Sequence, residues 1–212
     1  MTRPVQIEFW ADVMCPWCWI GKRRLDSAVA RLGRPVDVVW RSFELRPGHP
    51  AVPGPTLRDM MAVRYGLDAD RLGELFGRIE ELGAAEGLLL RPATARPVNS
   101  FDAHRLIRAA AEHGLADAMA ERLFAAHLTD NADVADRTVL TGLARDAGLD
   151  AGAVRAMLDG TEHAGAVLAD RRRAGHAGIR QVPTFVVDGV PAAAGAESTA
   201  VLLDRLRGAA GR

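Results

Sequence analysis

The stretch D12-V-M-C-P-W-C-W-I-G-K22 decides the fold, because the chain's two cysteines, Cys15 and Cys18, lie where one structural pattern gives way to another. Before it, residues 5–11 (VQIEFWA) are short and rich in β-branched and aromatic side chains, which predicts a buried strand. After it, apolar residues recur at helical spacing. Pro16 suits the first position of that helix, where its missing N–H has no partner to lose. The pair is therefore predicted at the start of a helix that follows a strand.

Three interpretations of the pair are open: a redox couple, half of a zinc site, or two inert buried thiols. At a helix N-terminus the amide groups of the first turn, pointing at the sulfur, and the helix dipole favour the thiolate form of Cys15. Cys18 lies nearly one turn further on, close enough to close a disulfide and to resolve a mixed disulfide at Cys15. A zinc site is disfavoured because the sequence has no second Cys pair and no His-x3–5-His spacing. The redox interpretation is preferred.

The composition is that of an ordinary globular chain. Of its 212 residues 49% are hydrophobic, and 27 basic residues balance 27 acidic ones, so no net charge attracts nucleic acid or an anionic membrane. The N-terminus lacks an unbroken apolar core, which argues against a signal peptide, and no window suits a transmembrane helix. We therefore expect a cytoplasmic protein. In that reducing compartment a close cysteine pair is more often catalytic or metal-binding than structural.

The pattern along the chain predicts two ends of mixed strand and helix around a helical middle. "PVDVVWRSFEL" (35–45) alternates like a second strand, and strand, helix, strand favours a parallel pair with a crossover helix. The proline-rich segment 46–55 then marks a boundary. Helical periodicity follows, at residues 57–65, 69–86, 100–113, 115–128, 134–147, 151–158 and 161–177. We expect one thioredoxin-fold part at 1–45, a helical insertion at 46–177 whose last helix returns to that fold, and a second part at 178–212.

Near the C-terminus the pattern returns to strand at "GIRQVPTFVVDGV" (178–190), where Asp188-Gly189 is a strong hairpin signal. "VPAAAG" (190–195) is the second strand of the hairpin, and a helix follows from about Glu197 to Leu206. Pro183 opens an apolar run, a placement that suits a cis bond to Val182 and would expose the Val182 backbone to an extended substrate. An ordinary trans proline at a strand start is the alternative.

Three segments, "FWADVMCPWCWIGKRRL" (9–25), "VNSFDAHRLIRAA" (98–110) and "GIRQVPTFVVDGVPAAAGAE" (178–197), resemble the FrnE-like branch of the DsbA thioredoxin-fold family over essentially the whole chain. The resemblance implies an α/β thioredoxin fold with a large α-helical insertion between the second strand and the cis-proline strand. It also implies site residues. Cys15 would be the nucleophile, Cys18 the resolving cysteine and Pro183 the cis-proline, and a substrate would bind at Pro16, Trp17, Val182, Pro183 and Asn99.

Two departures from the family pattern concern the substrate side and the redox poise. Relatives often have an aromatic residue after the cis-proline, where this chain has Thr184, and Ser-Gly-Ala-Gln near the end instead of "AAGAE". Between the cysteines stands Trp17, where better-known DsbA proteins have a histidine. Because indole carries no positive charge, one group that stabilises the thiolate is missing. The sequence thus predicts a couple less oxidising than DsbA, whose potential is about −120 mV.

The resulting hypothesis is a thiol-disulfide oxidoreductase that acts on protein or low-molecular-weight thiols and disulfides, with no nucleic-acid or membrane partner. No cofactor or metal is expected, although glutathione is a possible co-substrate. A glutathione-dependent isomerase or transferase, like the related 2-hydroxychromene-2-carboxylate isomerases and kappa-class glutathione transferases, is the alternative. Those enzymes present a serine where Cys15 stands. A holdase whose cysteines only sense oxidation is a third candidate. His104 is expected to be buried with its hydrogen bonds satisfied rather than near the sulfurs.

Overall fold

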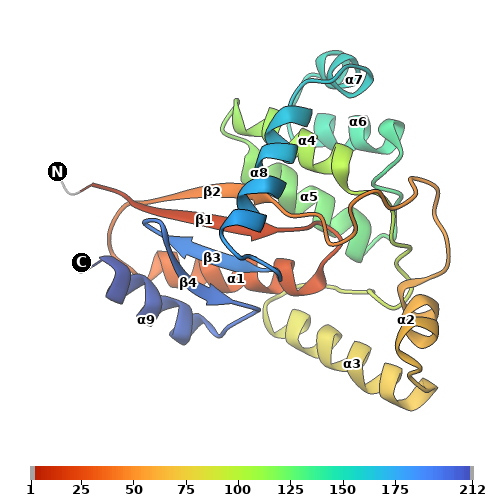
Figure 1. Cartoon of the computed structure of the whole chain (residues 1–212), viewed down its shortest axis with the longest axis horizontal. Coiled ribbons are helices and arrows are strands. Elements are labelled where there is room, and N and C mark those ends of the chain that lie inside the picture. The colour runs from red at the N-terminus through yellow and green to blue at the C-terminus, as the bar shows by residue number, and fades with distance from the viewer. Residues whose placement is uncertain (1–2, 211–212) are drawn as a thin grey trace.

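The computed structural model describes residues 3–210, and within this range four strands form one sheet in the order β2-β1-β3-β4 (Figure 1). The strands are β1 (Val5–Ala11), β2 (Val36–Ser42), β3 (Thr184–Val187) and β4 (Val190–Ala194). β1 pairs with β2 in parallel and with β3 in antiparallel, so the two central strands come from opposite ends of the chain. The predicted parallel pair with a crossover helix is confirmed, since α1 (Pro16–Ala30) connects β1 to β2.

The remaining helices cover the sheet and extend beyond it. They are α2 (Leu57–Tyr65), α3 (Ala69–Ala85), α4 (Phe101–Ala111), α5 (Ala116–Leu128), α6 (Arg137–Asp146), α7 (Ala151–Asp159), α8 (Ala164–His176) and α9 (Thr199–Ala210). α1 packs against α9, and α8 crosses β2 (Figure 1). α2 and α3 lie apart from α4, α6, α7 and α8, on the other side of the end of the sheet (Figure 1). The expected α/β architecture with a helical insertion between the second and third strands is thus observed.

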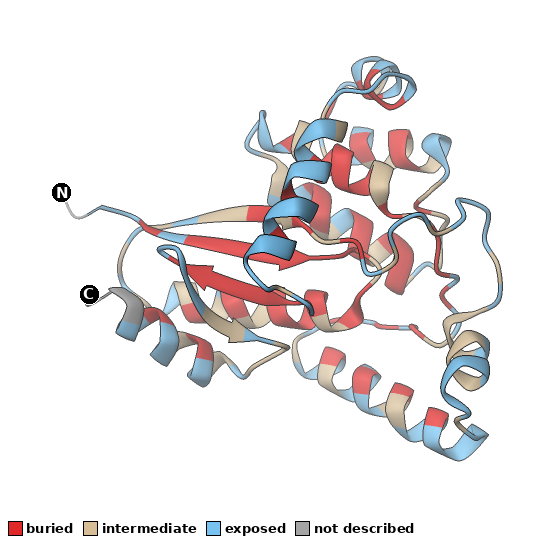
Figure 2. Ribbon diagram, viewed as in Figure 1, coloured by how far each residue is buried: buried red, intermediate tan, exposed pale blue. Residues whose placement is uncertain are grey.

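The core is centred on β1, which is buried at every position but one (Figure 2). Its Phe9 ring stacks on Phe185 of β3 at 5.2 Å between centroids and meets the edge of Trp40 of β2 at 4.8 Å. Trp19 of α1 stacks on Phe124 of α5 at 5.9 Å. Such aromatic contacts stabilise beyond the area they bury. They tie the sheet to the helical insertion directly beneath the cysteine-bearing end of α1.

The β3–β4 connection is the predicted two-residue hairpin. Asp188 and Gly189 both have positive φ, 47° and 82°, as the common hairpin turn requires at its two central positions. The Asp188 carboxylate also accepts the N–H of Gln6 at 3.2 Å, which joins the turn to β1. The boundaries expected at residues 46 and 178 stay predictions. Within residues 3–210, no helix has both the length and the apolar character needed to cross a membrane.

Candidate functional site

Cys15 and Cys18 lie where β1 ends and α1 begins, as predicted. Cys15 is the N-cap residue with extended backbone (φ −101°, ψ 111°), Pro16 is the first helical residue, and the Cys18 N–H donates to the Cys15 carbonyl at 3.0 Å. Both thiols are free, and their residues are 5% and 0% exposed. The helix amides do not hydrogen-bond the Cys15 sulfur, contrary to expectation, because that sulfur is turned toward another segment.

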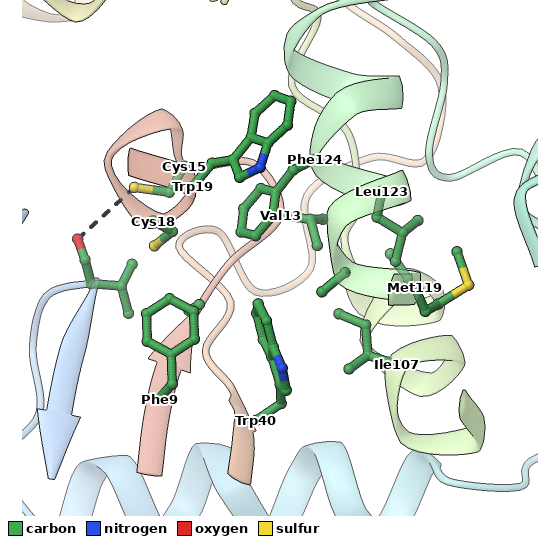
Figure 3. Packing of buried hydrophobic residues seen from close by; sticks show 14 of the residues in the cluster. Phe9, Val13, Cys15, Cys18, Trp19, Trp40, Ile107, Met119, Leu123 and Phe124 are labelled. Carbon is green, nitrogen blue, oxygen red and sulfur yellow. Dashed lines mark hydrogen bonds between the residues drawn. The ribbon is translucent and has the colours of Figure 1, made fainter. Parts of the chain in front are cut away.

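That segment is the loop before β3. The Cys15 Sγ lies 3.9 Å from the Val182 carbonyl oxygen, the contact marked by the dashed line in Figure 3. The Val182–Pro183 bond is cis, which confirms the interpretation of this proline. Gly21 allows α1 to pack closely against Pro183, because a Cβ at Gly21 would come within 2.9 Å of the Pro183 Cγ. The structure therefore brings together Cys15, Cys18 and the Val182–Pro183 pair from opposite ends of the sequence.

Cys18 is the thiol that holds its proton. Burial raises its pKa well above the usual range, and a hydrogen bond with Cys15 and the charge on Cys15 raise it further. In Figure 3 both sulfurs lie near the start of α1, with Phe9 and Trp40 below them. The two cysteines are thus chemically unequal, with Cys15 at the surface of the cavity described below and Cys18 behind it.

Asp12 is a site residue that sequence reasoning treated only as the end of a strand. Its carboxylate accepts the N–H of Leu45 at 2.7 Å and of Met14 at 3.2 Å, and its carbonyl accepts the Cys15 N–H at 3.0 Å. Burial would raise the pKa of Asp12, but contacts with His104 and these two amides outweigh it and leave the pKa lowered. A buried carboxylate therefore holds the turn that carries the nucleophilic cysteine candidate.

His104 faces this carboxylate, with its Nε2 3.5 Å from Asp12 Oδ1. The histidine is buried as expected, but its Nε2 has no hydrogen-bond partner among the described residues, so its hydrogen bonds are not all satisfied. Glu44 is the next acid in the cluster; burial raises its pKa, and His104 opposes that effect. The sequence offered no signal for this cluster, because its members come from three separate segments.

A cavity of about 450 Å³ opens beside Cys15. Of the predicted site residues, Cys15, Pro16, Trp17 and Val182 line it. Helices α2 and α3 supply much of the opposite wall, including Met61 of α2. The insertion thus converts the end of the sheet into a pocket whose volume suits a small ligand, roughly 300 to 1,000 Å³.

Asn99 makes two hydrogen bonds to the backbone. Its Oδ1 accepts the N–H of Phe101 at 2.8 Å, and its Nδ2 donates to the His49 carbonyl at 2.8 Å. It therefore caps the start of α4 and holds the loop after β2 in place. The cavity wall contains its neighbours Val98 and Ser100 rather than Asn99. The role of Asn99 in substrate binding that the resemblance implied stays a prediction.

In the part of the chain that the structure describes, the two cysteines have no neighbouring side chains that would complete a metal site. No group of three or more His, Cys, Asp or Glu side chains within residues 3–210 is placed to hold a metal ion. Asp12 accepts two backbone amides, and His104 lies 3.5 Å from it. What the arrangement can do chemically is expose one thiol to a cavity and keep a second thiol behind it.

Comparisons with known proteins point to one family. The model of the DSBA-like thioredoxin domain matches residues 6–207. A probable DsbA oxidoreductase from Streptomyces coelicolor is 35% identical with a TM-score of 0.92, covering 98% of this chain and 91% of that one. The uncharacterised protein YwbO of Bacillus subtilis is 27% identical over 90% of this chain and 92% of its own length. The cytosolic disulfide reductase DsbM from Pseudomonas aeruginosa, solved with GSH, shares the fold at 23% identity and a TM-score of 0.59, with coverage of 97% and 96%.

Proposed function

The chain belongs to the DSBA-like thioredoxin domain family of oxidoreductases and isomerases, and we propose that it exchanges disulfides through Cys15 and Cys18. One observation carries the proposal: the Cys15 sulfur stands at the start of α1, 3.9 Å from the Val182 carbonyl, with the Cys18 thiol behind it. This geometry presents a nucleophile beside a backbone segment against which a substrate can lie.

In the first step the Cys15 thiolate attacks one sulfur of a substrate disulfide. A bond forms between Cys15 and that sulfur, the substrate S–S bond breaks, and the other sulfur leaves as a thiolate that takes up a proton. The mixed disulfide then lies beside Val182 and Pro183.

In the second step Cys18 displaces the bound product. The hydrogen bond and the negative charge of Cys15, which raise the pKa of Cys18, are lost once Cys15 is in a mixed disulfide. Cys18 can then lose its proton to the departing thiolate and attack the Cys15 sulfur. A Cys15–Cys18 disulfide forms, and the substrate has gained two electrons. The order of the steps is thus set by the pair itself, and the reverse sequence oxidises a dithiol.

We also propose that glutathione serves as a co-substrate and that the protein acts in the cytoplasm. The DsbM structure contains GSH and that protein is cytosolic, which supports both ideas by similarity of fold.

The test is covalent trapping with oxidised glutathione. Cys18→Ser should accumulate a mixed disulfide at Cys15, because nothing remains to displace the glutathionyl group, and intact-mass spectrometry should detect one adduct per chain. Cys15→Ser should accumulate none, since Cys18 is fully buried. Equal adduct levels in the two variants would contradict these roles.

A second function, glutathione-dependent isomerisation or transfer, is favoured by the cavity of about 450 Å³ beside the helix start. It predicts turnover of a small substrate that requires glutathione but survives Cys18→Ser. Disulfide exchange predicts that the same variant loses multiple turnover. One set of assays on that variant separates the two functions.

A further inference from the structure

The cavity beside Cys15 has an apolar wall that thiol-disulfide exchange alone does not require. The wall is built largely from the insertion: Leu57, Met61, Leu75, Phe76, Ile79 and Val98 line it. Since Cys15 is only 5% exposed, the way to its sulfur is through this cavity rather than across an open surface. The space therefore suits a small molecule with an apolar frame better than a folded protein.

Three arginines, Arg46, Arg64 and Arg180, line the same cavity. No carboxylate within residues 3–210 forms an ion pair with any of the three. Arg46 contacts the Met60 sulfur, and Arg64 lies over the Tyr65 ring at 5.6 Å. Arg41, by contrast, pairs with Glu8 at 2.6 Å.

The cavity has no acid free to neutralise these arginines. Asp12 is the one acidic residue in its lining, and both carboxylate oxygens of this buried side chain already accept backbone N–H groups. Burial lowers the pKa of the half-buried Arg46, and the charge of Arg64 lowers it further. Two guanidinium groups that line an apolar pocket thus repel each other, a repulsion that a bound anion would relieve.

We propose that this cavity selects small organic disulfides that carry a carboxylate on an apolar or aromatic frame, with Arg46 and Arg64 binding the carboxylate and Arg180 adding positive charge. The proposal rests on the disulfide exchange inferred above and names its substrate class. The apolar frame lies against the α2–α3 wall, the carboxylate reaches the guanidinium groups, and the disulfide lies at Cys15.

The test compares three disulfides by stopped-flow kinetics at fixed pH and low salt. 5,5′-Dithiobis(2-nitrobenzoate) is aromatic and anionic, 4,4′-dithiodipyridine is aromatic and uncharged, and 3,3′-dithiodipropionate is anionic without an aromatic frame. Each rate constant is divided by the value for free cysteine, which removes the intrinsic reactivity of the reagent. The normalised rate should be highest for the nitrobenzoate, and added salt should lower it for the two anionic reagents but not for dithiodipyridine.

Arg46→Gln/Arg64→Gln should slow the nitrobenzoate by about 10-fold or more and leave dithiodipyridine unchanged. Arg64→Gln alone, at an exposed position, should show part of the effect and carries no risk to folding. Arg155→Gln, an exposed arginine of α7 outside the cavity, is the matched control and should change neither rate.

Two outcomes would overturn the proposal. One is a nitrobenzoate rate that does not respond to Arg64→Gln or to salt, and the other is a normalised rate no higher than that of the other two reagents. Failure of disulfide exchange itself would look different, because Cys15 would then react with none of the three faster than free cysteine does.

Discussion

The helices between β2 and β3 fall into two groups that are built differently. α2 buries none of its residues and α3 buries a single stripe, whereas α4 and α5 are buried over much of their length (Figure 2). The α2–α3 group encloses the cavity, while the α4–α8 group packs on the sheet and on itself. The two groups of helices in this insertion therefore have different roles. The packed group adds buried contacts to the fold, and the open group lines the cavity beside Cys15.

Arg105 of α4 should show the largest difference between the groups. This residue is 3% exposed, donates to the carbonyls of Gly160 and Glu162 at 2.9 Å each, and pairs with Asp102 at 2.6 Å. Arg105→Met removes the donor from these carbonyls and from the carbonyls of the buried Met157 and Leu158, so we expect urea denaturation to show a loss of about 3 to 5 kcal/mol. Arg64→Met in the open group should cost less than about 0.5 kcal/mol. Similar losses would erase the distinction.

His127 of α5 should make the packed group sensitive to acid. Burial lowers its pKa to about 4, although the charge of Asp12 opposes this. Between about pH 6.5 and pH 4 His127 is therefore protonated in the unfolded chain but not in the folded chain. The free energy of unfolding consequently decreases as the pH is lowered through this range. At about 1.4 kcal/mol per pKa unit the loss from this residue approaches roughly 3 kcal/mol.

The measurement is the free energy of unfolding at several pH values. His127→Gln should flatten the slope over this range, while His113→Gln, at an exposed position, should leave it unchanged. A slope that persists in His127→Gln would assign the acid sensitivity to other groups.

Gly21, which packs against Pro183 beside the cysteines, can be compared with Gly73 of the open group. A Cβ on Gly21 would meet Pro183 at 2.9 Å, whereas one on Gly73 of α3 would meet nothing within 4 Å. Gly21→Ala should therefore cost about 1 to 3 kcal/mol and slow alkylation of Cys15. Gly73→Ala should stabilise by about 0.5 to 1 kcal/mol, because alanine is the better helix former. Equal changes in the free energy of unfolding would show that Gly21 tolerates a Cβ beside Pro183 as well as Gly73 tolerates one in open space.

Trp17 should give the smallest effect, on redox poise rather than on stability. Trp17 lies between the two cysteines in the sequence, and its side chain lines the cavity. Trp17→His supplies a group that can carry positive charge, so the potential should rise by about 30 mV, which corresponds to about 1.4 kcal/mol. Equilibration with glutathione buffers measures it. The unchanged protein should lie below about −120 mV, and a value at that level would contradict the sequence-based prediction.

Periodicity was sufficient to predict the strands and helices, with differences at their ends. The last helix begins at Thr199 rather than near Glu197, because Ser198 caps it by accepting the Val201 N–H on its hydroxyl. The family resemblance of the segments around Cys15 and Pro183 implied that these two segments form one site, and the structure brings them together. These features depend on local patterns that the sequence displays directly.

The cluster around Asp12 and the arginines of the cavity could not be predicted in this way. The partners of Asp12, Leu45 and His104, come from distant segments, and their pairing depends on how α4 packs against the end of β1. Arg46 and Arg180 lie in loops and Arg64 lies in α2, and the three segments share no motif. Substrate preference is therefore the part of the function that required the structure.

The order of the strands has a consequence for synthesis. Cys15 meets Val182 only after 167 further positions have been added. At about 5 to 20 residues per second a ribosome needs roughly 10 to 30 s for that stretch. During this time the nascent chain carries an open dithiol with neither its backbone partner nor a finished cavity. A chain that stalls before β3 would therefore react with any disulfide it meets, so selectivity is the last property that translation confers.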